Sequence, residues 1–196
     1  REVYATSGTR ISLRFFGGWN YPPDMCDNPD WLGDAYDNGV PMGGDLSDET
    51  GTAPRFLVSA LADPGTTDYP GTPLHKIQII KGWLDADGTP TQKIIDVIGG
   101  DTPPLSVDTA SCEREDGGTT SLCTVWQDPD FDPSLNAFYY ARVLEEPSCR
   151  YHTYLCNQLE EEELPLGCTS PQVAKIIQER AWSSPIWFNT VSEVDP

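Results

Sequence analysis

Three groups of aspartates have the spacing to hold a divalent cation. Carboxylate oxygens are the ligands that Ca²⁺ prefers, and a loop that clusters several of them is a candidate site. The groups are Asp24, Asp27, Asp30, Asp34 and Asp37, then Asp85 and Asp87, and finally Asp128, Asp130 and Asp132. The first two groups make Ca²⁺ the one cofactor that the residues of this chain suggest.

The same aspartates also fit ordinary turns. Asp85-Ala-Asp-Gly88 is similar to part of an EF-hand loop, but the closing Glu is absent and Gly88 stands at the wrong offset. A strand is expected after it where an EF-hand would have a helix. This segment therefore fits a turn, and Asp128-Pro-Asp-Phe-Asp-Pro133 fits a strand connection in which Asp side chains accept hydrogen bonds from backbone amides.

Residues for acid–base or nucleophilic catalysis are few. Neither of the two histidines, His75 and His152, has a partner residue at a spacing that would mark it as a catalytic base. This favours structural or surface roles for both. No nucleophile elbow, zinc helix or phosphate loop occurs, and Thr6-Ser7-Gly8-Thr9 has hydroxyls without the glycine–lysine frame of a phosphate loop. We therefore expect no complete active site in this chain.

Aromatic residues in an Asp- and Asn-rich segment suggest a second kind of site. Trp19, Tyr21, Trp31 and Tyr36 have the composition of a carbohydrate-stacking loop. The same rings could instead pin a long loop onto the domain, and this interpretation is favoured.

The net charge of the chain limits the classes of partner that it is expected to bind. Thirty-one acidic residues against 12 basic ones give a formal charge of −19, which repels phosphate backbones and excludes nucleic acid as an expected partner. The charge fits solubility better than it fits attraction of cations or basic partners. No apolar run reaches the roughly 20 residues of a membrane span.

Six cysteines indicate disulfides. An even number without metal-binding spacing is typical of an oxidising compartment, so we expect a periplasmic or extracellular protein, the alternative being buried free thiols. Cys112 and Cys123 flank an acidic, Gly-rich loop and are predicted to pair. Cys149, Cys156 and Cys168 bracket the Glu160–Glu163 run, and Cys26 is left to pair with one of these three.

Short alternating segments predict the fold. Seven strands are expected, at Ile11–Phe16 (ended by Gly17-Gly18), Arg55–Leu61, Lys76–Trp83, Gln92–Val97, Leu122–Trp126, Ala137–Leu144 and Ile186–Phe188. The third and fourth form a hairpin across an Asp-Gly turn. Helices are expected at Tyr151–Leu159 and, from its composition, at Pro171–Arg180, where β-branched residues leave the assignment open; long loops are expected at 17–49 and 101–118. The fold class is mainly β, an antiparallel β-sandwich with long loops and one or two short helices.

Several segments, taken in order, resemble one family. They are Glu2–Arg10, Arg14–Trp19, Gly39–Leu46, Ile77–Trp83, Val125–Pro133, Phe138–Leu144 and Gln178–Trp187. The chain resembles the C-terminal part of an uncharacterised (domain of unknown function) family of exported proteins. These proteins are related to the metallohydrolases of the polymerase-and-histidinol-phosphatase (PHP) type, which are carbaryl-hydrolase-like.

The resemblance implies a module without its own metal site. In that family a His- and Asp-rich barrel holding divalent metal comes first, and none of its metal motifs can be placed on this chain. Residues 1–10 would be the junction from a missing upstream barrel, and 11–196 a single β-sandwich-like domain. Thr6, Ser7 and Arg10 stand at this junction and are the predicted substrate-binding residues.

Two functions follow as hypotheses. In the first, the chain packs on the upstream catalytic domain and shapes its rim, with self-association as a further possible role. In the second, it is a non-enzymatic secreted binding or structural protein, with carbohydrate as a candidate ligand.

Overall fold

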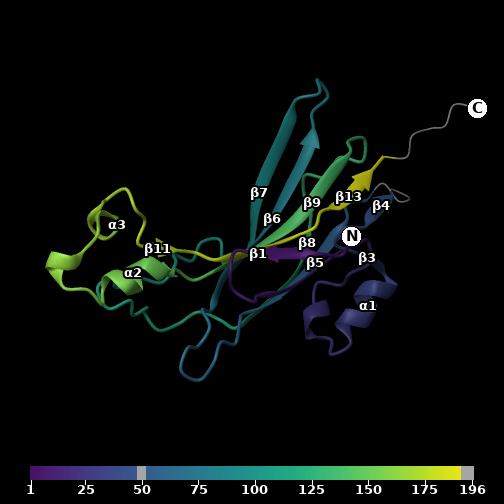
Figure 1. Ribbon diagram of the computed structural model, residues 1–196. Helices are drawn as coiled ribbons and strands as arrows, with labels where there is room; N and C mark the ends of the chain where they lie inside the picture. The colour runs from purple at the N-terminus through teal and green to yellow at the C-terminus, as the bar shows by residue number, and fades with distance from the viewer. Residues whose placement is uncertain (48–51, 191–196) are drawn as a thin grey trace, which may run out of the picture.

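A seven-stranded sheet is built around one central strand, β9. The computed structural model describes residues 1–47 and 52–190. In the described residues, β6 pairs with one edge of β9, while β12 and β13 pair with the two ends of its other edge; β7, β1 and β4 extend the sheet outward (Figure 1). The strands are β1 (Tyr4–Thr6), β4 (Asp45–Ser47), β6 (Leu74–Leu84), β7 (Pro90–Ile98), β9 (Ala137–Glu145), β12 (Arg180–Ser183) and β13 (Ile186–Asn189). Pairing is antiparallel except between β13 and β4, which are parallel.

A four-stranded sheet packs against the first. Its order is β3 (Gly39–Pro41), β2 (Ser12–Gly18), β5 (Arg55–Leu61) and β8 (Ser121–Gln127). All seven predicted strands are present, and the β6–β7 hairpin turns at Gly88, whose φ of +81° suits glycine. Gly17 and Gly18 do not end β2 as predicted, because they continue its pairing with β5. The mainly β, sandwich-like fold is confirmed.

The inner faces of the two sheets form the main core. Phe15 and Phe56 stack at 5.6 Å between ring centroids, and Phe56 meets Tyr139 of the opposite sheet at 4.3 Å. Every second residue of β9 is buried, which is the period expected of a strand with one face on a core. Burial of these rings supplies the main driving force that holds the sheets together.

A short helix covers the outer face of the smaller sheet. The predicted long loop 17–49 contains η1 (Met25–Asp27) and α1 (Trp31–Asp37), while residues 48–49 lie outside the described part. Phe16 and Leu57 point outward from the sheet and are buried beneath these elements. Tyr21 is buried too and donates its hydroxyl to the Ala35 carbonyl oxygen at 2.8 Å. Trp31 and Tyr36 make edge-to-face contacts with Phe16, so the loop aromatics pin this segment, as favoured above.

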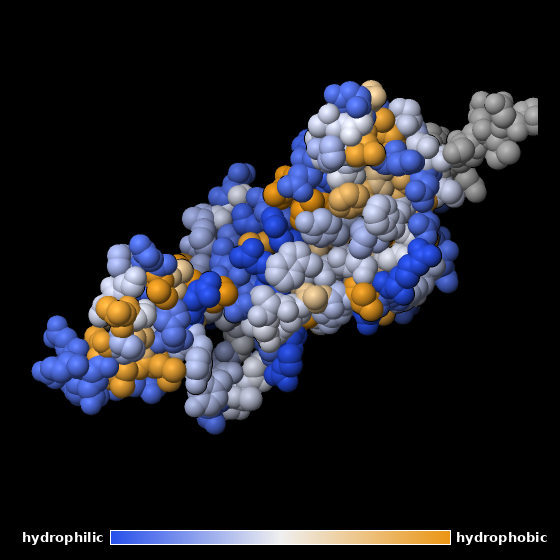
Figure 2. Space-filling model, turned by 45° about the horizontal axis from the view of Figure 1, so that its top comes forward, coloured by the Kyte–Doolittle hydropathy of each residue, from blue (hydrophilic) through white to orange (hydrophobic). Residues whose placement is uncertain are grey.

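Residues 146–179 form an outlying lobe beyond the end of β9, which we call the disulfide lobe (Figures 1 and 2). Its elements are β10 (Ser148–Cys149), α2 (Tyr151–Cys156), η2 (Glu161–Glu163), α3 (Leu166–Thr169) and β11 (Ile176–Ile177). The helix predicted at Tyr151–Leu159 is confirmed, although it ends at Cys156. The helix predicted at Pro171–Arg180 is wrong. Its β-branched Ile176 and Ile177 pair with β10 instead, which satisfies their backbone groups in a sheet.

The disulfides form, but two predicted pairings are wrong. Cys26 joins Cys123, Cys112 joins Cys149, and Cys156 joins Cys168. Cys123 lies on the same face of β8 as Val125, which is the outer face of the smaller sheet. There it faces η1 and meets Cys26. The Cys112–Cys123 pairing therefore cannot form. Only Cys156–Cys168, which brackets the Glu160–Glu163 run, agrees with an expected location.

Within the described residues, no helix has the length and apolar character needed to cross a membrane.

Candidate functional site

The predicted site residues lie together at the end of the sandwich from which the disulfide lobe projects. Thr6 ends β1 opposite Ala181, and the Ser7 hydroxyl donates to the Glu179 carboxylate. Arg10 makes two side-chain hydrogen bonds to Asp63, at 3.0 and 3.1 Å. This bidentate contact holds the pKa of Asp63 well below its usual range, first through the Arg10 side chain and then through backbone amides. We call Thr6, Ser7, Thr9, Arg10, Asp63, Glu145 and Glu179 the junction cluster.

A buried carboxyl group lies at the centre of the junction cluster. Glu145, the last residue of β9, is 0% exposed, and neither of its carboxyl oxygens has a hydrogen-bond partner among the described residues. Burial raises the pKa of Glu145 to about 7, and the negative charges of Glu179 and Asp63 add to this rise. The Thr9 side chain and the Arg114 charge lower the pKa and so oppose part of this rise. The inward register of β9 could have revealed this residue, since Glu145 follows Val143 on the core face.

Glu145 should make the folded protein less stable as pH rises from about 4.5 to 7. The folded state holds the proton more tightly than the unfolded state, so the neutral acid's stabilisation is complete below pH 4.5 and is lost through pH 7. The rise of this pKa from 4.5 to about 7 corresponds to about 3 kcal/mol. Glu145→Gln should therefore be more stable than the native chain at pH 8 and nearly equal at pH 4.5 in urea unfolding.

The neighbouring Glu146 supplies a matched control. It is also buried, but its carboxylate accepts a 2.8 Å hydrogen bond from the Leu105 amide. Glu146→Gln should show no gain at pH 8. Equal pH profiles for Glu145→Gln and the native chain would contradict the role given to Glu145.

The aspartates of the second and third groups serve local structure. Asp85 accepts hydrogen bonds from Trp83 Nε1 and Thr91 Oγ1, and Asp87 accepts one from the Thr89 amide, so the predicted turn is confirmed. Asp128 and Asp132 likewise accept from the amides two residues onward, as predicted. Among the described residues, no group of three His, Cys, Asp or Glu side chains could hold a metal ion.

His75 is a structural histidine. Its Nε2 lies 2.9 Å from the Thr102 carbonyl oxygen, and its Nδ1 lies 3.3 Å from Gln178 Nε2. One tautomer satisfies both, with Nε2–H donating and Nδ1 accepting.

A buried ion pair escaped the sequence analysis. Lys81 Nζ donates to Asp128 at 2.6 Å, and the Tyr139 hydroxyl donates to the same carboxylate at 2.8 Å. Burial, followed by the Asp128 charge, raises the pKa of Tyr139. The signal was present, because Lys81 continues the inward register of Ile77 and Ile79 on β6. The sandwich therefore contains a charged contact between β6 and the 128–133 connection.

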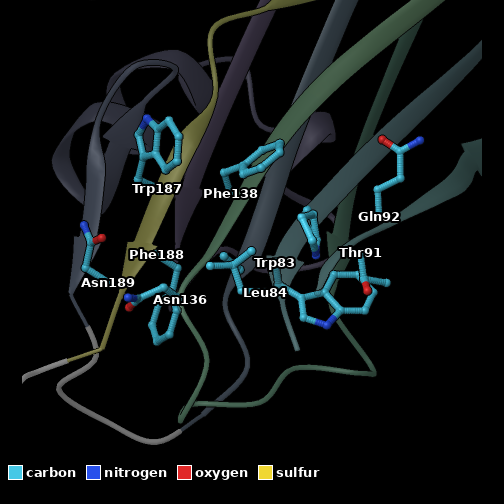
Figure 3. Close-up of a pocket in the computed structure, with 12 residues that line it drawn as sticks. Trp83, Leu84, Thr91, Gln92, Asn136, Phe138, Trp187, Phe188 and Asn189 are labelled. Carbon is cyan, nitrogen blue, oxygen red and sulfur yellow. The ribbon is translucent and has the colours of Figure 1, made fainter. Parts of the chain in front are cut away.

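An apolar groove lies on the outer face of the larger sheet, at the end away from the lobe (Figure 3). Its volume is about 550 Å³. Gln92, Gly82, Phe138 and Trp187 are cross-strand neighbours in one row over β7, β6, β9 and β13. Leu84 lies at the centre of the groove, with Asn136 and Asn189 on the β13 side. Sequence reasoning missed this groove because its residues come from four separate segments.

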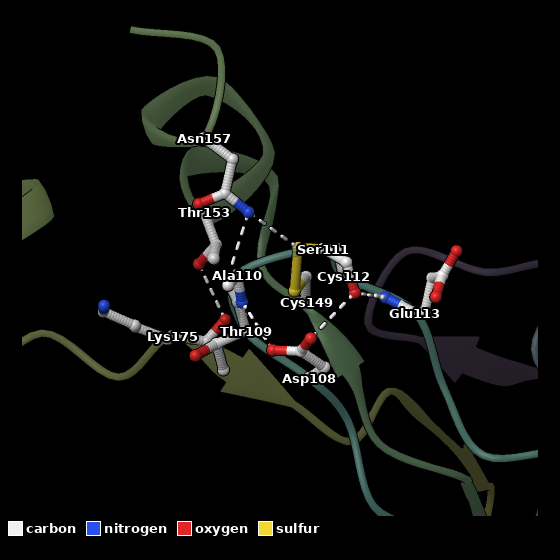
Figure 4. The surroundings of a disulfide bond; sticks show 10 residues. All are labelled: Asp108, Thr109, Ala110, Ser111, Cys112, Glu113, Cys149, Thr153, Asn157 and Lys175. Carbon is white, nitrogen blue, oxygen red and sulfur yellow. Dashed lines mark hydrogen bonds between the residues drawn. A yellow bond between two sulfur atoms is a disulfide. The ribbon is translucent and has the colours of Figure 1, made fainter. Parts of the chain in front are cut away.

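Exposed apolar side chains gather on the disulfide lobe (Figure 2). Leu166 is 86% exposed, and the other exposed apolar residues are Tyr151, Tyr154, Leu155, Leu159, Val173 and Ile176. The Cys112–Cys149 bond ties the loop 101–118 to the lobe, and Asn157 Nδ2 donates to the Thr109 carbonyl at 3.0 Å beside it (Figure 4). Thr153 Oγ1 donates to the Lys175 carbonyl at 2.7 Å and joins α2 to the segment before β11. The lobe is braced from within, and its surface carries these apolar side chains beside the exposed Glu160–Glu163 run.

These features define a disulfide-bonded β-sandwich protein with a polar cluster at one end, a lobe with exposed apolar side chains and an apolar groove. The model of the family described as "Protein of unknown function (DUF3604)" matches residues 1–190, so the chain belongs to this family. No curated protein and no solved structure matches the chain.

Proposed function

We propose that this chain is the β-sandwich module of an exported relative of the PHP metallohydrolases, and that it packs on the catalytic barrel and shapes its rim. The observation that carries the proposal is the exposed apolar surface of the disulfide lobe. Contiguous apolar surface of this kind is typical of protein–protein contact sites. Three disulfides support export, since such bonds persist in oxidising compartments.

The junction cluster supports the same arrangement. The lobe starts directly after Glu145 and returns to the sheet at Glu179, so its apolar surface and the cluster share one end of the molecule. A barrel that docks on the lobe would meet Ser7 and Arg10, which are exposed. These two side chains would then contribute to the rim of the barrel's site, together with Thr6.

A pair of charge insertions in the full-length protein tests this role. Leu166→Asp should weaken packing between module and barrel, and should split a single thermal transition into two in calorimetry. Ile94→Asp is the control, because Ile94 is also an exposed apolar residue, 49% against 86% for Leu166, and lies on β7, away from the lobe. Equal behaviour of the two variants would contradict the proposal, as would a native protein whose mass is only the 21.6 kDa of this chain.

A second function is favoured by a different observation. The apolar groove of Figure 3 combines aromatic rings with side-chain amides, which is the composition of a small-molecule site. We propose as the alternative that the chain is a non-enzymatic secreted binding protein. Ligand binding that persists when Leu166→Asp has separated the module from its neighbour would favour this alternative.

A further inference from the structure

The lining of the apolar groove is uncharged in a strongly acidic chain. The formal charge is −19, yet each described residue that lines the groove is neutral. Two carboxylates next to the groove already have partners: Asp85, which follows Leu84 in the chain, and Asp45, which lies opposite Trp187 in the sheet. Asp85 accepts from Trp83 Nε1 and Thr91 Oγ1, and Asp45 pairs with Arg1 at 3.0 Å. A charged ligand would find no counter-charge in this groove, so its chemistry selects a neutral one.

The Phe138 ring lies over Gly82 on the floor of the groove. A Cβ at position 82 would lie 2.3 Å from the Phe138 ring, so only glycine lets this ring lie across β6. Trp187 is next to it and 43% exposed, with the ring centroids 5.4 Å apart and the ring planes at 54°, so the two rings form an angled apolar surface. Aromatic rings held by a sheet present large apolar area at little entropic cost.

Side-chain amides border this floor. In the described part of the chain, Gln92 and Asn189 make no side-chain hydrogen bond, which leaves donors and acceptors on both sides of the rings. Asn136 uses its Oδ1 to accept from the Thr190 amide at 2.7 Å, which leaves its NH₂ group as a donor. Amides can both donate to and accept from neighbouring hydroxyl groups.

We infer that the groove binds a neutral saccharide, with a sugar ring seated in the angle between Phe138 and Trp187 and its hydroxyls on Gln92, Asn136 and Asn189. A pyranose ring has this alternation of C–H faces and a hydroxyl rim. The volume of about 550 Å³ falls within the usual ~300–1,000 Å³ of small-molecule sites.

The groove stays accessible if the lobe docks on another domain. Phe138 lies near the start of β9 and Glu145 at its end, a separation of about 23 Å at roughly 3.3 Å per residue. The inference therefore goes beyond the proposed packing role, and either one can fail without the other.

Titration of the full-length protein with neutral oligosaccharides tests the inference. The probes are hexamers of β-1,4-linked and β-1,3-linked glucose, with oligogalacturonate as the acidic comparison, followed by tryptophan fluorescence and calorimetry. We expect at least one neutral probe to bind and the acidic one to bind at least about tenfold more weakly. Trp187→Ala should weaken binding by about tenfold, since stacking on one ring contributes on the order of one such factor.

Two further variants separate the site from general damage. Tyr69→Ala removes an exposed ring that does not line the groove, and it should leave affinity unchanged within about twofold. Gln92→Ala should weaken binding without changing the melting temperature. No binding by any neutral probe, equal binding of the acidic probe, or equal effects of Trp187→Ala and Tyr69→Ala would overturn the inference. Self-association of the native protein that Trp187→Ala abolishes would also overturn it, because the groove would then be an interface between copies.

Discussion

Removal of the Cys26–Cys123 disulfide should lower the free energy of unfolding by about 4–5 kcal/mol. The bond closes a segment of 97 residues, and the entropy that a cross-link removes from the unfolded chain grows with the length of the closed segment. It also fastens η1 to β8, over the outer cluster that contains Phe16 and Leu57. The Cys26→Ala/Cys123→Ala variant should show this loss in denaturant unfolding without reductant.

The Cys156–Cys168 bond is the internal comparison. It closes only 12 residues, for which the same chain-entropy argument gives about 3 kcal/mol. Its loss should also be confined to the lobe, so the sandwich core should keep its hydrogen-exchange protection. If Cys156→Ala/Cys168→Ala costs more than Cys26→Ala/Cys123→Ala, segment length does not control the contribution of these bonds.

Lys81→Met should destabilise the fold by about 3–5 kcal/mol. The substitution leaves the Asp128 carboxylate buried, with the Tyr139 hydroxyl and the Asp130 amide as its hydrogen-bond donors. Asp128→Asn should also destabilise, because Lys81 would keep the Asp130 carbonyl but lose its counter-charge. The double variant should cost less than the sum of the single ones, because neither charge is then left buried alone.

A double-mutant cycle measures this coupling. Substitutions without interaction add to within about 0.5 kcal/mol, so additivity here would contradict the ion-pair role. Lys93→Met is the control, because Lys93 pairs with the neighbouring Asp130 at an exposed position. It should change stability far less than Lys81→Met, since water screens exposed pairs.

Local residues predicted the strands but not every helix. The β6–β7 hairpin could be read from two alternating segments around an Asp-Gly turn, since both signals lie within a few residues. The α1 helix was missed, although Trp31 and Ala35 have helical spacing after Asp30, because Asp, Asn and Gly around them favour turns. The helix predicted at Pro171–Arg180 failed because partner strands, absent from any local window, decide whether a β-branched segment extends.

The candidate site was predictable only in part. Thr6, Ser7 and Arg10 were chosen from their position in the chain, and the fold gathers them with Asp63 and Glu179. Whether they bind substrate remains a prediction. Lys81 and Glu145 stand at inward-facing positions of their strands. From the sequence alone, however, a charged residue at such a position is taken to be exposed, because the groups around it are not known.

The sequence by itself determined the β-rich class, the main strands, the turns capped by aspartate and the presence of disulfides. Each of these depends on residues close together in the chain or on composition. Only the tertiary structure decided the cysteine pairing, the buried Lys81–Asp128 contact, the elevated pKa of Glu145 and the groove over Gly82. These four depend on segments far apart in sequence, whose contacts are set by how the two sheets pack.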